Sequence, residues 1–113
     1  MIVRSSEMQL EKKQMRGGDG ECTVLNILPP KQVPHGRLFS TITVEKGCSI
    51  GVHDHVNETE YYFILKGEGI VTEVDGEKRV GEGDLVITGG GASHSIRNEM
   101  DEPLVFIALI IFD

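Results

Sequence analysis

Short apolar segments alternate with glycine-containing turns along most of the chain, and this rhythm restricts the fold more than any other feature of the sequence. The segments are rich in Val, Ile, Leu and Thr and recur about every ten residues, which is typical of short strands joined by tight turns. Strands are expected at 22–28, 38–44, 49–55, 60–66, 70–74, 77–80, 85–88, 93–97 and 104–112. The pattern predicts an all-β antiparallel sandwich or closed barrel and does not choose between them.

The length of 113 residues fits one domain and is enough to bury a hydrophobic core. Within that single domain, residues 1–36 are expected to supply N-terminal strands and a loop that pack on a barrel core formed by residues 37–113. Residues 7–15 are too polar to be assigned to a helix or a strand. The sequence therefore predicts one domain with a less regular N-terminal part.

The charge balance disfavours two classes of partner. There are 11 Lys and Arg residues against 18 Asp and Glu, a net charge of −7, whereas nucleic acids and anionic membranes attract basic surfaces.

The longest apolar run, at 104–112, is too short to cross a bilayer as a helix, and the N-terminus lacks the apolar stretch of a signal peptide. Cys22 and Cys48 form no CxxC pair and are interpreted as free thiols. We expect a soluble cytoplasmic protein that binds neither nucleic acid nor membranes.

Three of the four histidines occupy positions that suggest a metal site. His53 and His55 are two residues apart on an expected strand, so both imidazoles project to the same side. Glu60 follows a polar turn, and His94 follows three consecutive glycines. Imidazoles with one carboxylate suit Mn²⁺, Fe²⁺, Co²⁺, Ni²⁺, Cu²⁺ or Zn²⁺ better than Ca²⁺ or Mg²⁺. A His-x-His pair alone is equally typical of structural histidines on a wet sheet face.

Two longer motifs surround these residues. Residues 47–67 read as Gly, five residues, His-x-His, four residues, Glu, six residues, Gly. Residues 83–98 read as Gly, five residues, Gly-x-Gly, two residues, His, three residues, Asn. Together they resemble the two signatures of the cupin superfamily, of the small single-domain type. The second signature usually has proline where this chain has Gly89, which predicts a less rigid loop before His94.

The resemblance implies a double-stranded β-helix (jelly-roll) barrel that binds one divalent transition metal. The implied ligands are His53, His55, Glu60 and His94. Glu58 is a second carboxylate near the histidine pair, but the spacing favours Glu60. The resemblance also assigns turns to Gly47, Gly67, Gly83 and Gly91, and a loop-capping role to Asn98.

Strand alternation adds residues that face the same side as the ligands. If Glu60 points inward, Tyr62 and Ile64 do as well. Tyr62 is then the candidate catalytic residue, as a hydrogen-bond donor or weak acid beside the metal, although a packed aromatic side chain would fit the same position. Arg37 and Lys66 lie at strand ends and are interpreted as solvated surface charges, and His35 as a surface residue.

Two classes of function are compatible with these features. The first is a small metalloenzyme such as a dioxygenase, decarboxylase, isomerase or lyase, with the metal acting as a Lewis acid or oxygen activator on a small polar molecule. The second is a non-catalytic module that binds metal and a small ligand. The segment 104–112 is apolar on both faces, and together with the resemblance it predicts a homodimer.

Overall fold

The computed structural model describes residues 1–113 and contains ten strands and two short 3₁₀ helices. The helices are η1 (Ser5–Glu7) and η2 (Pro30–Gln32). The strands are β1 (Gln9–Lys13), β2 (Cys22–Leu28), β3 (Gly36–Val44), β4 (Ser49–Asp54), β5 (Glu58–Lys66), β6 (Gly69–Glu73), β7 (Gly76–Val80), β8 (Leu85–Gly89), β9 (Ser93–Arg97) and β10 (Leu104–Phe112).

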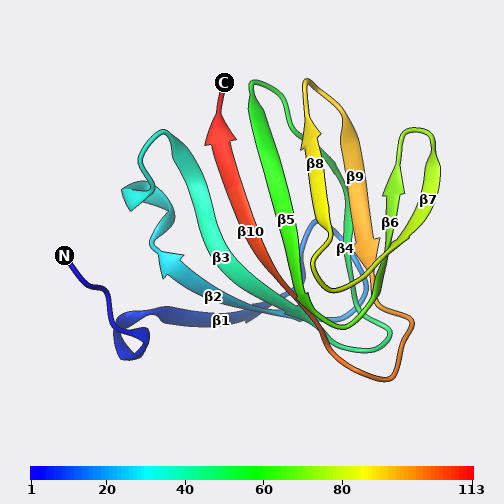
Figure 1. Ribbon diagram of the computed structural model, residues 1–113, viewed down its shortest axis with the longest axis horizontal. Helices are drawn as coiled ribbons and strands as arrows, with labels where there is room; N and C mark the ends of the chain where they lie inside the picture. Colours follow the sequence, from blue (N-terminus) through cyan, green and yellow to red (C-terminus); the bar gives the residue numbers. More distant parts are fainter.

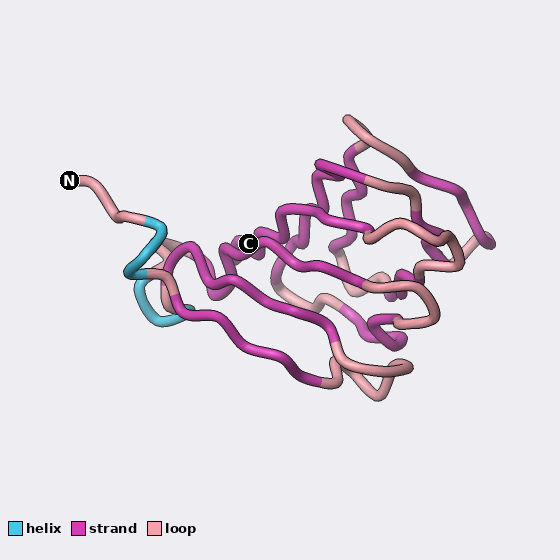
Figure 2. The backbone as a smooth tube through the Cα atoms, turned by 90° about the horizontal axis from the view of Figure 1, so that it is seen from below, coloured by secondary structure: helices cyan, strands magenta, loops and turns pink.

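Two antiparallel sheets face each other and form the jelly-roll barrel that the motifs predicted (Figure 1). The larger sheet has the order β1-β2-β3-β10-β5-β8, and the smaller one has the order β4-β9-β6-β7. The first residues of the chain extend away from both sheets (Figure 2). Strands distant in sequence are therefore neighbours, and β10 lies between β3 and β5.

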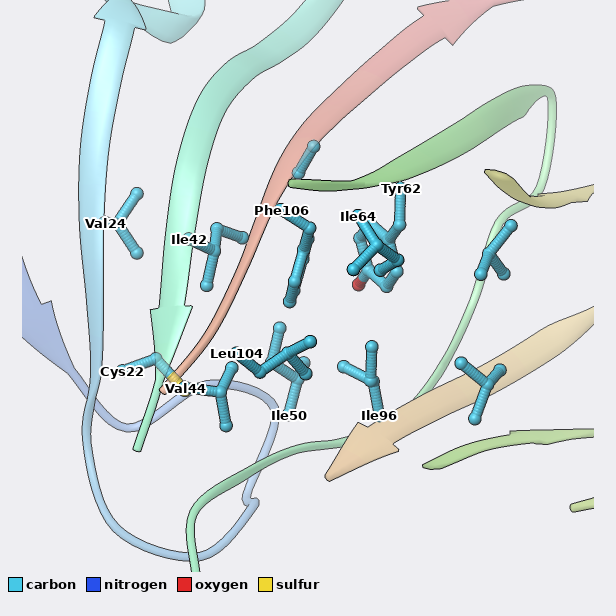
Figure 3. Close-up of a cluster of buried hydrophobic side chains, with 13 residues drawn as sticks. Cys22, Val24, Ile42, Val44, Ile50, Tyr62, Ile64, Ile96, Leu104 and Phe106 are labelled. Carbon is cyan, nitrogen blue, oxygen red and sulfur yellow. The ribbon is translucent and has the colours of Figure 1, made fainter. Parts of the chain in front are cut away.

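The hydrophobic core fills the space between the sheets, because alternate residues of each strand point inward (Figure 3). In β10, Phe106 and Ala108 are fully buried. Tyr62 from β5 packs against Phe106, with ring centroids 4.5 Å apart. The smaller sheet contributes Ile50 and Ile96 to the same cluster. No helix in the structure is long and apolar enough to span a membrane.

The largest difference from the sequence-based assignment is β1, which pairs with β2 at the edge of the larger sheet. Its residues are mostly exposed, so the strand lacks the apolar alternation that would identify it. The short helix η2 lies within residues 1–36, which were expected to contain only strands and a loop.

Several turn residues behave as expected. Gly47, Gly67, Gly83 and Gly91 have φ values of 80°, 80°, 85° and 85°, a region that glycine enters without strain. The Asn98 side chain donates to the carbonyl oxygens of Val44 and Glu102 and so holds the loop after β9.

Candidate metal centre

Strands from both sheets bring the four sequence-predicted side chains together. His53 lies in β4 and His55 directly after it, while His94 pairs with His53 across the β4–β9 ladder. Glu60 comes from β5 in the opposite sheet. All four side chains are buried, and their ligand atoms lie within 4.8 Å of one another.

The Nδ1 atoms of the histidines are engaged away from the cluster. His53 Nδ1 lies 2.7 Å from the carbonyl oxygen of Gly51, which can only accept a hydrogen bond, so this nitrogen carries the proton. His55 Nδ1 likewise donates to the Glu58 carboxylate at 2.6 Å. His94 Nδ1 lies 2.8 Å from the Thr88 hydroxyl. In the neutral rings of His53 and His55, each Nε2 therefore presents a lone pair.

These Nε2 atoms meet around one carboxylate oxygen. His94 Nε2 lies 3.0 Å from His53 Nε2 and 3.1 Å from His55 Nε2. Glu60 Oε1 lies 2.8 Å from His55 Nε2, 2.9 Å from His94 Nε2 and 3.4 Å from His53 Nε2. Lone pairs at such distances repel unless a positive charge lies among them. The residues present therefore fit a divalent metal ion.

The spacing also fits ligands that share one ion. Two ligands at right angles around an ion, with bonds of about 2.1 Å, lie about 3.0 Å apart. Five of the six ligand pairs lie 2.8–3.4 Å apart. The remaining pair, His53 and His55, lies within 4.8 Å. The four side chains would therefore be able to hold one ion between them.

The protonation of Glu60 and His94 suits metal ligation. Burial opposes ionisation of Glu60, but the neighbouring imidazoles of His53, His55 and His94 outweigh it and hold its pKa well below the usual range. Burial also lowers the pKa of His94, which favours the neutral imidazole. Metal ligation requires an ionised carboxylate and neutral imidazoles.

A second carboxylate, Glu58, supports the cluster from one side. It accepts a hydrogen bond from His55 and two from Arg37, both at 2.7 Å. The bond to Arg37, aided by the bond to His55 and opposed by burial, lowers the pKa of Glu58 to about 2. Glu58 therefore orients the His55 ring and does not belong to the ligand cluster. Strand alternation could have identified it, since Glu58, Glu60 and Tyr62 share one face of β5.

The interpretation of Arg37 as a solvated surface charge was wrong. Its guanidinium makes a two-pronged ion pair with Glu58, and its side chain is 40% exposed. Glu58 lies 21 residues further along the chain, so no local pattern linked the two. Lys66 and His35 are exposed, as expected.

Tyr62 faces inward, as strand alternation predicted. Its ring stacks on His94, with centroids 5.0 Å apart and an interplanar angle of 16°. Burial, together with the negative charge of Glu60, raises the pKa of Tyr62 well above 10. The side chain is therefore a neutral phenol that both packs in the core and lines the cavity above the cluster.

The cluster lies at the wall of a cavity of about 240 Å³. Six of its 13 lining residues are hydrophobic, and the lining also includes the cationic residues Lys13, Arg16 and Arg37. Glu60 is the only acidic residue in the lining. A larger hollow of about 590 Å³ lies elsewhere and carries Glu68, Glu82, Asp101 and Glu102. The cavity beside the cluster is thus the one that suits an anion.

Gly89, where the second motif usually has proline, ends β8 opposite Thr59. A Cβ atom at this position would lie 2.5 Å from the Thr59 hydroxyl oxygen. The missing side chain thus leaves room for Thr59.

Comparisons with known proteins agree with this architecture. The family model described as "Cupin domain" matches residues 40–111, which include all four cluster residues. The chain belongs to the cupin family. This cupin is 40% identical to a Thermotoga maritima protein named oxalate-binding protein, over 98% of this chain and 93% of the relative.

Solved structures extend the comparison. A crystal structure from Thermotoga maritima, described as a predicted oxalate decarboxylase, superposes on this cupin with a TM-score of 0.91. The two chains are 38% identical, and the match covers all of both. A putative sugar phosphate isomerase from Acidithiobacillus ferrooxidans has a TM-score of 0.78 at 22% identity, covering 97% of this chain and 74% of that one. At that identity the likeness shows the shared fold alone.

Proposed function

We propose that this cupin binds one divalent transition metal through His53, His55, Glu60 and His94 and holds a small dicarboxylate on it. The observation that carries the proposal is the convergence of three imidazole nitrogens and one carboxylate oxygen within 4.8 Å, beside a cavity lined by cationic side chains. A divalent ion in this cluster would supply a positive charge that attracts and polarises carboxylate oxygens.

The arrangement of the four ligands favours a chelating molecule. Four protein ligands would leave two positions free on an ion that takes six. A dicarboxylate could fill both with one oxygen from each carboxylate. Oxalate is the smallest such ligand, and the relative that is 40% identical is named an oxalate-binding protein.

The cavity lining favours binding over turnover. Its one acidic residue, Glu60, belongs to the proposed ligand set, and burial with the charge of Glu60 keeps the pKa of Tyr62 well above 10. General acid–base catalysis works best with a group whose pKa lies near the working pH. Neither residue meets this requirement, so we propose a binding module.

The test is calorimetric titration of oxalate into protein stripped of metal and then reloaded separately with Mn²⁺, Fe²⁺, Co²⁺, Ni²⁺, Cu²⁺ or Zn²⁺. We expect about one equivalent of metal per chain and oxalate binding that requires the metal. Failure to retain any of these ions, or equal oxalate affinity with and without metal, would overturn the proposal.

An enzymatic role is the second candidate, because the structure with a TM-score of 0.91 is described as a predicted oxalate decarboxylase. In that role the neutral Tyr62 phenol would donate a proton or a hydrogen bond beside the metal. Incubating the metal-loaded protein with oxalate and measuring carbon dioxide and formate separates the candidates. Turnover that is lost in Tyr62→Phe would establish the enzyme, and binding without product would establish the module.

Replacing Glu58 with glutamine should weaken metal binding by about 10- to 100-fold, the usual effect of losing a group that orients a ligand. The variant removes the negative charge that accepts the His55 Nδ1 proton at 2.6 Å. Competition with a chelating dye measures the affinity. The matched control is Glu82→Gln, which changes an exposed carboxylate outside this cavity and should leave the affinity unchanged. Equal affinity of both variants would show that Glu58 does not support the site.

We also propose that the outer face of the larger sheet joins two copies of the chain. Phe63 and Leu65 of β5 and Leu85 and Ile87 of β8 are 42–57% exposed on neighbouring strands. Exposed apolar patches of this kind mark interaction sites, and symmetric dimers are the commonest assembly.

Ile87→Lys should convert the dimer to a monomer, because it would bury a charge within this patch. Sedimentation velocity at micromolar concentration measures the change. Val74→Lys introduces the same charge at an apolar residue that is 79% exposed outside the patch, and it should remain dimeric. A monomeric unmodified protein would refute the proposed assembly.

A further inference from the structure

The connection between β1 and β2 lies tightly against β4, close to the metal-ligand cluster. Met15 forms a bridge with Ile50, and the Gly51 amide donates to the Met15 carbonyl oxygen at 3.1 Å. A Cβ atom at Gly18 would lie 2.2 Å from the Ser49 carbonyl oxygen, and one at Gly51 would lie 2.1 Å from the Arg16 carbonyl oxygen. The two backbones can approach this closely only because glycine stands on both sides. The connection is therefore fixed on the strand that carries His53.

Arg16 occupies an unfavourable position in this connection. The Gly18 amide donates to the Met15 carbonyl oxygen at 3.0 Å, which closes a four-residue turn. The two central residues, Arg16 and Gly17, have φ values of 54° and 71°. Turns with two left-handed residues favour Asn, Asp or Gly there, and a long side chain is strained. An arginine at this point has no local advantage for the backbone.

Arg16 is also the one cationic residue of the cavity lining that lacks a carboxylate partner. Arg37 is paired with Glu58 at 2.7 Å, and Lys13 lies 3.4 Å from Glu11. No carboxylate lies within ion-pair distance of Arg16, whose side chain is exposed at the cavity. Its guanidinium is therefore free to bind an anion in two-pronged fashion.

We infer that Arg16 determines ligand specificity in this cavity, by binding the carboxylate oxygens of a dianion that do not bind the metal. The inference rests on the proposed function. It names the residue that makes the site prefer dicarboxylates over ligands with a single carboxylate. Arg37 contributes less, because Glu58 already neutralises it. Backbone strain at Arg16 is then the structural cost of placing a free guanidinium beside the ligand.

Arg16→Asn tests the inference, because it should weaken oxalate binding and at the same time stabilise the fold. Asparagine suits the left-handed turn, so the midpoint of thermal unfolding should rise by about 4 °C. Oxalate affinity of the Mn²⁺-loaded protein should fall about tenfold or more, since a charge-assisted contact is lost. The affinity for oxamate, which has one carboxylate and one amide, should fall less, so the preference for oxalate should shrink. Manganese stoichiometry should stay unchanged.

Arg79→Asn is the matched control, because it removes the same charge from an exposed position on β7. It should bind oxalate as the unmodified protein does. If Arg16→Asn also keeps full oxalate affinity, Arg16 is not a specificity residue and the proposed function still stands. If Arg16→Asn unfolds at a lower temperature and its affinities for oxalate and oxamate fall by the same factor, the residue is structural and the inference is wrong. If the unmodified Mn²⁺-loaded protein binds no oxalate, the proposed function fails and this inference fails with it.

Discussion

Replacing His94 with alanine is expected to abolish stable metal binding and to lower the metal affinity by more than about 100-fold. That is the largest usual effect of removing a residue that only hydrogen-bonds to a ligand, so removal of a ligand itself should exceed it. His94 is the central member of the cluster, since its Nε2 atom lies 2.9–3.1 Å from the ligand atoms of Glu60, His53 and His55. Its loss would remove one of the four proposed ligands and leave a gap beside the Glu60 carboxylate. Elemental analysis after gel filtration and dye competition measure the change.

The matched control for this variant is His35→Ala. His35 is an exposed histidine outside the cavity lining, so its removal should leave one equivalent of metal bound. Unchanged metal content and affinity in His94→Ala would contradict the proposed ligand set directly.

The second large effect is expected from Phe106→Ala, which should lower the free energy of unfolding by about 3–5 kcal/mol. Phe106 is fully buried in β10 and packs on Tyr62, which in turn stacks on His94. A loss of this size is a large part of the stability of an ordinary domain, about 5–15 kcal/mol. Urea unfolding followed by circular dichroism measures it, and metal affinity should fall as well because Tyr62 loses its support.

Phe112→Ala provides the comparison, since that ring is 49% exposed at the end of the same strand and its loss should cost less than about 1 kcal/mol. If Phe106→Ala does not fold, Phe106→Leu should still be measurably destabilised. A change below about 1 kcal/mol in Phe106→Ala would show that the ring does not support the core.

Local patterns predicted much of the fold. Alternation along β5 correctly placed Tyr62 and Ile64 inside, where both are 1% exposed. The same reasoning failed for β1, because an edge strand exposed on both faces carries no alternation. Pattern alone also left open whether the sheets form a barrel or a sandwich, since that depends on pairings between distant strands.

The cluster residues could be found from sequence because the motif spacing fixes them along the chain. Their surroundings could not. Glu58 and Arg37 meet through strands that are separated in sequence, and Arg16 reaches the cavity through a contact between Met15 and Ile50. Such contacts arise only after the chain has folded, so the charges that line the cavity were not predicted.

The place of β10 in the larger sheet has a consequence for biosynthesis. It is the last strand in the chain order, yet it is the only strand that joins β3 to β5. Until it inserts, a nascent polypeptide has two bare strand edges with unpaired amides, which are templates for aggregation. Ribosomes that stop before residue 104 would therefore release fragments that cannot assemble the larger sheet, and these fragments should depend on chaperones or proteases for their clearance.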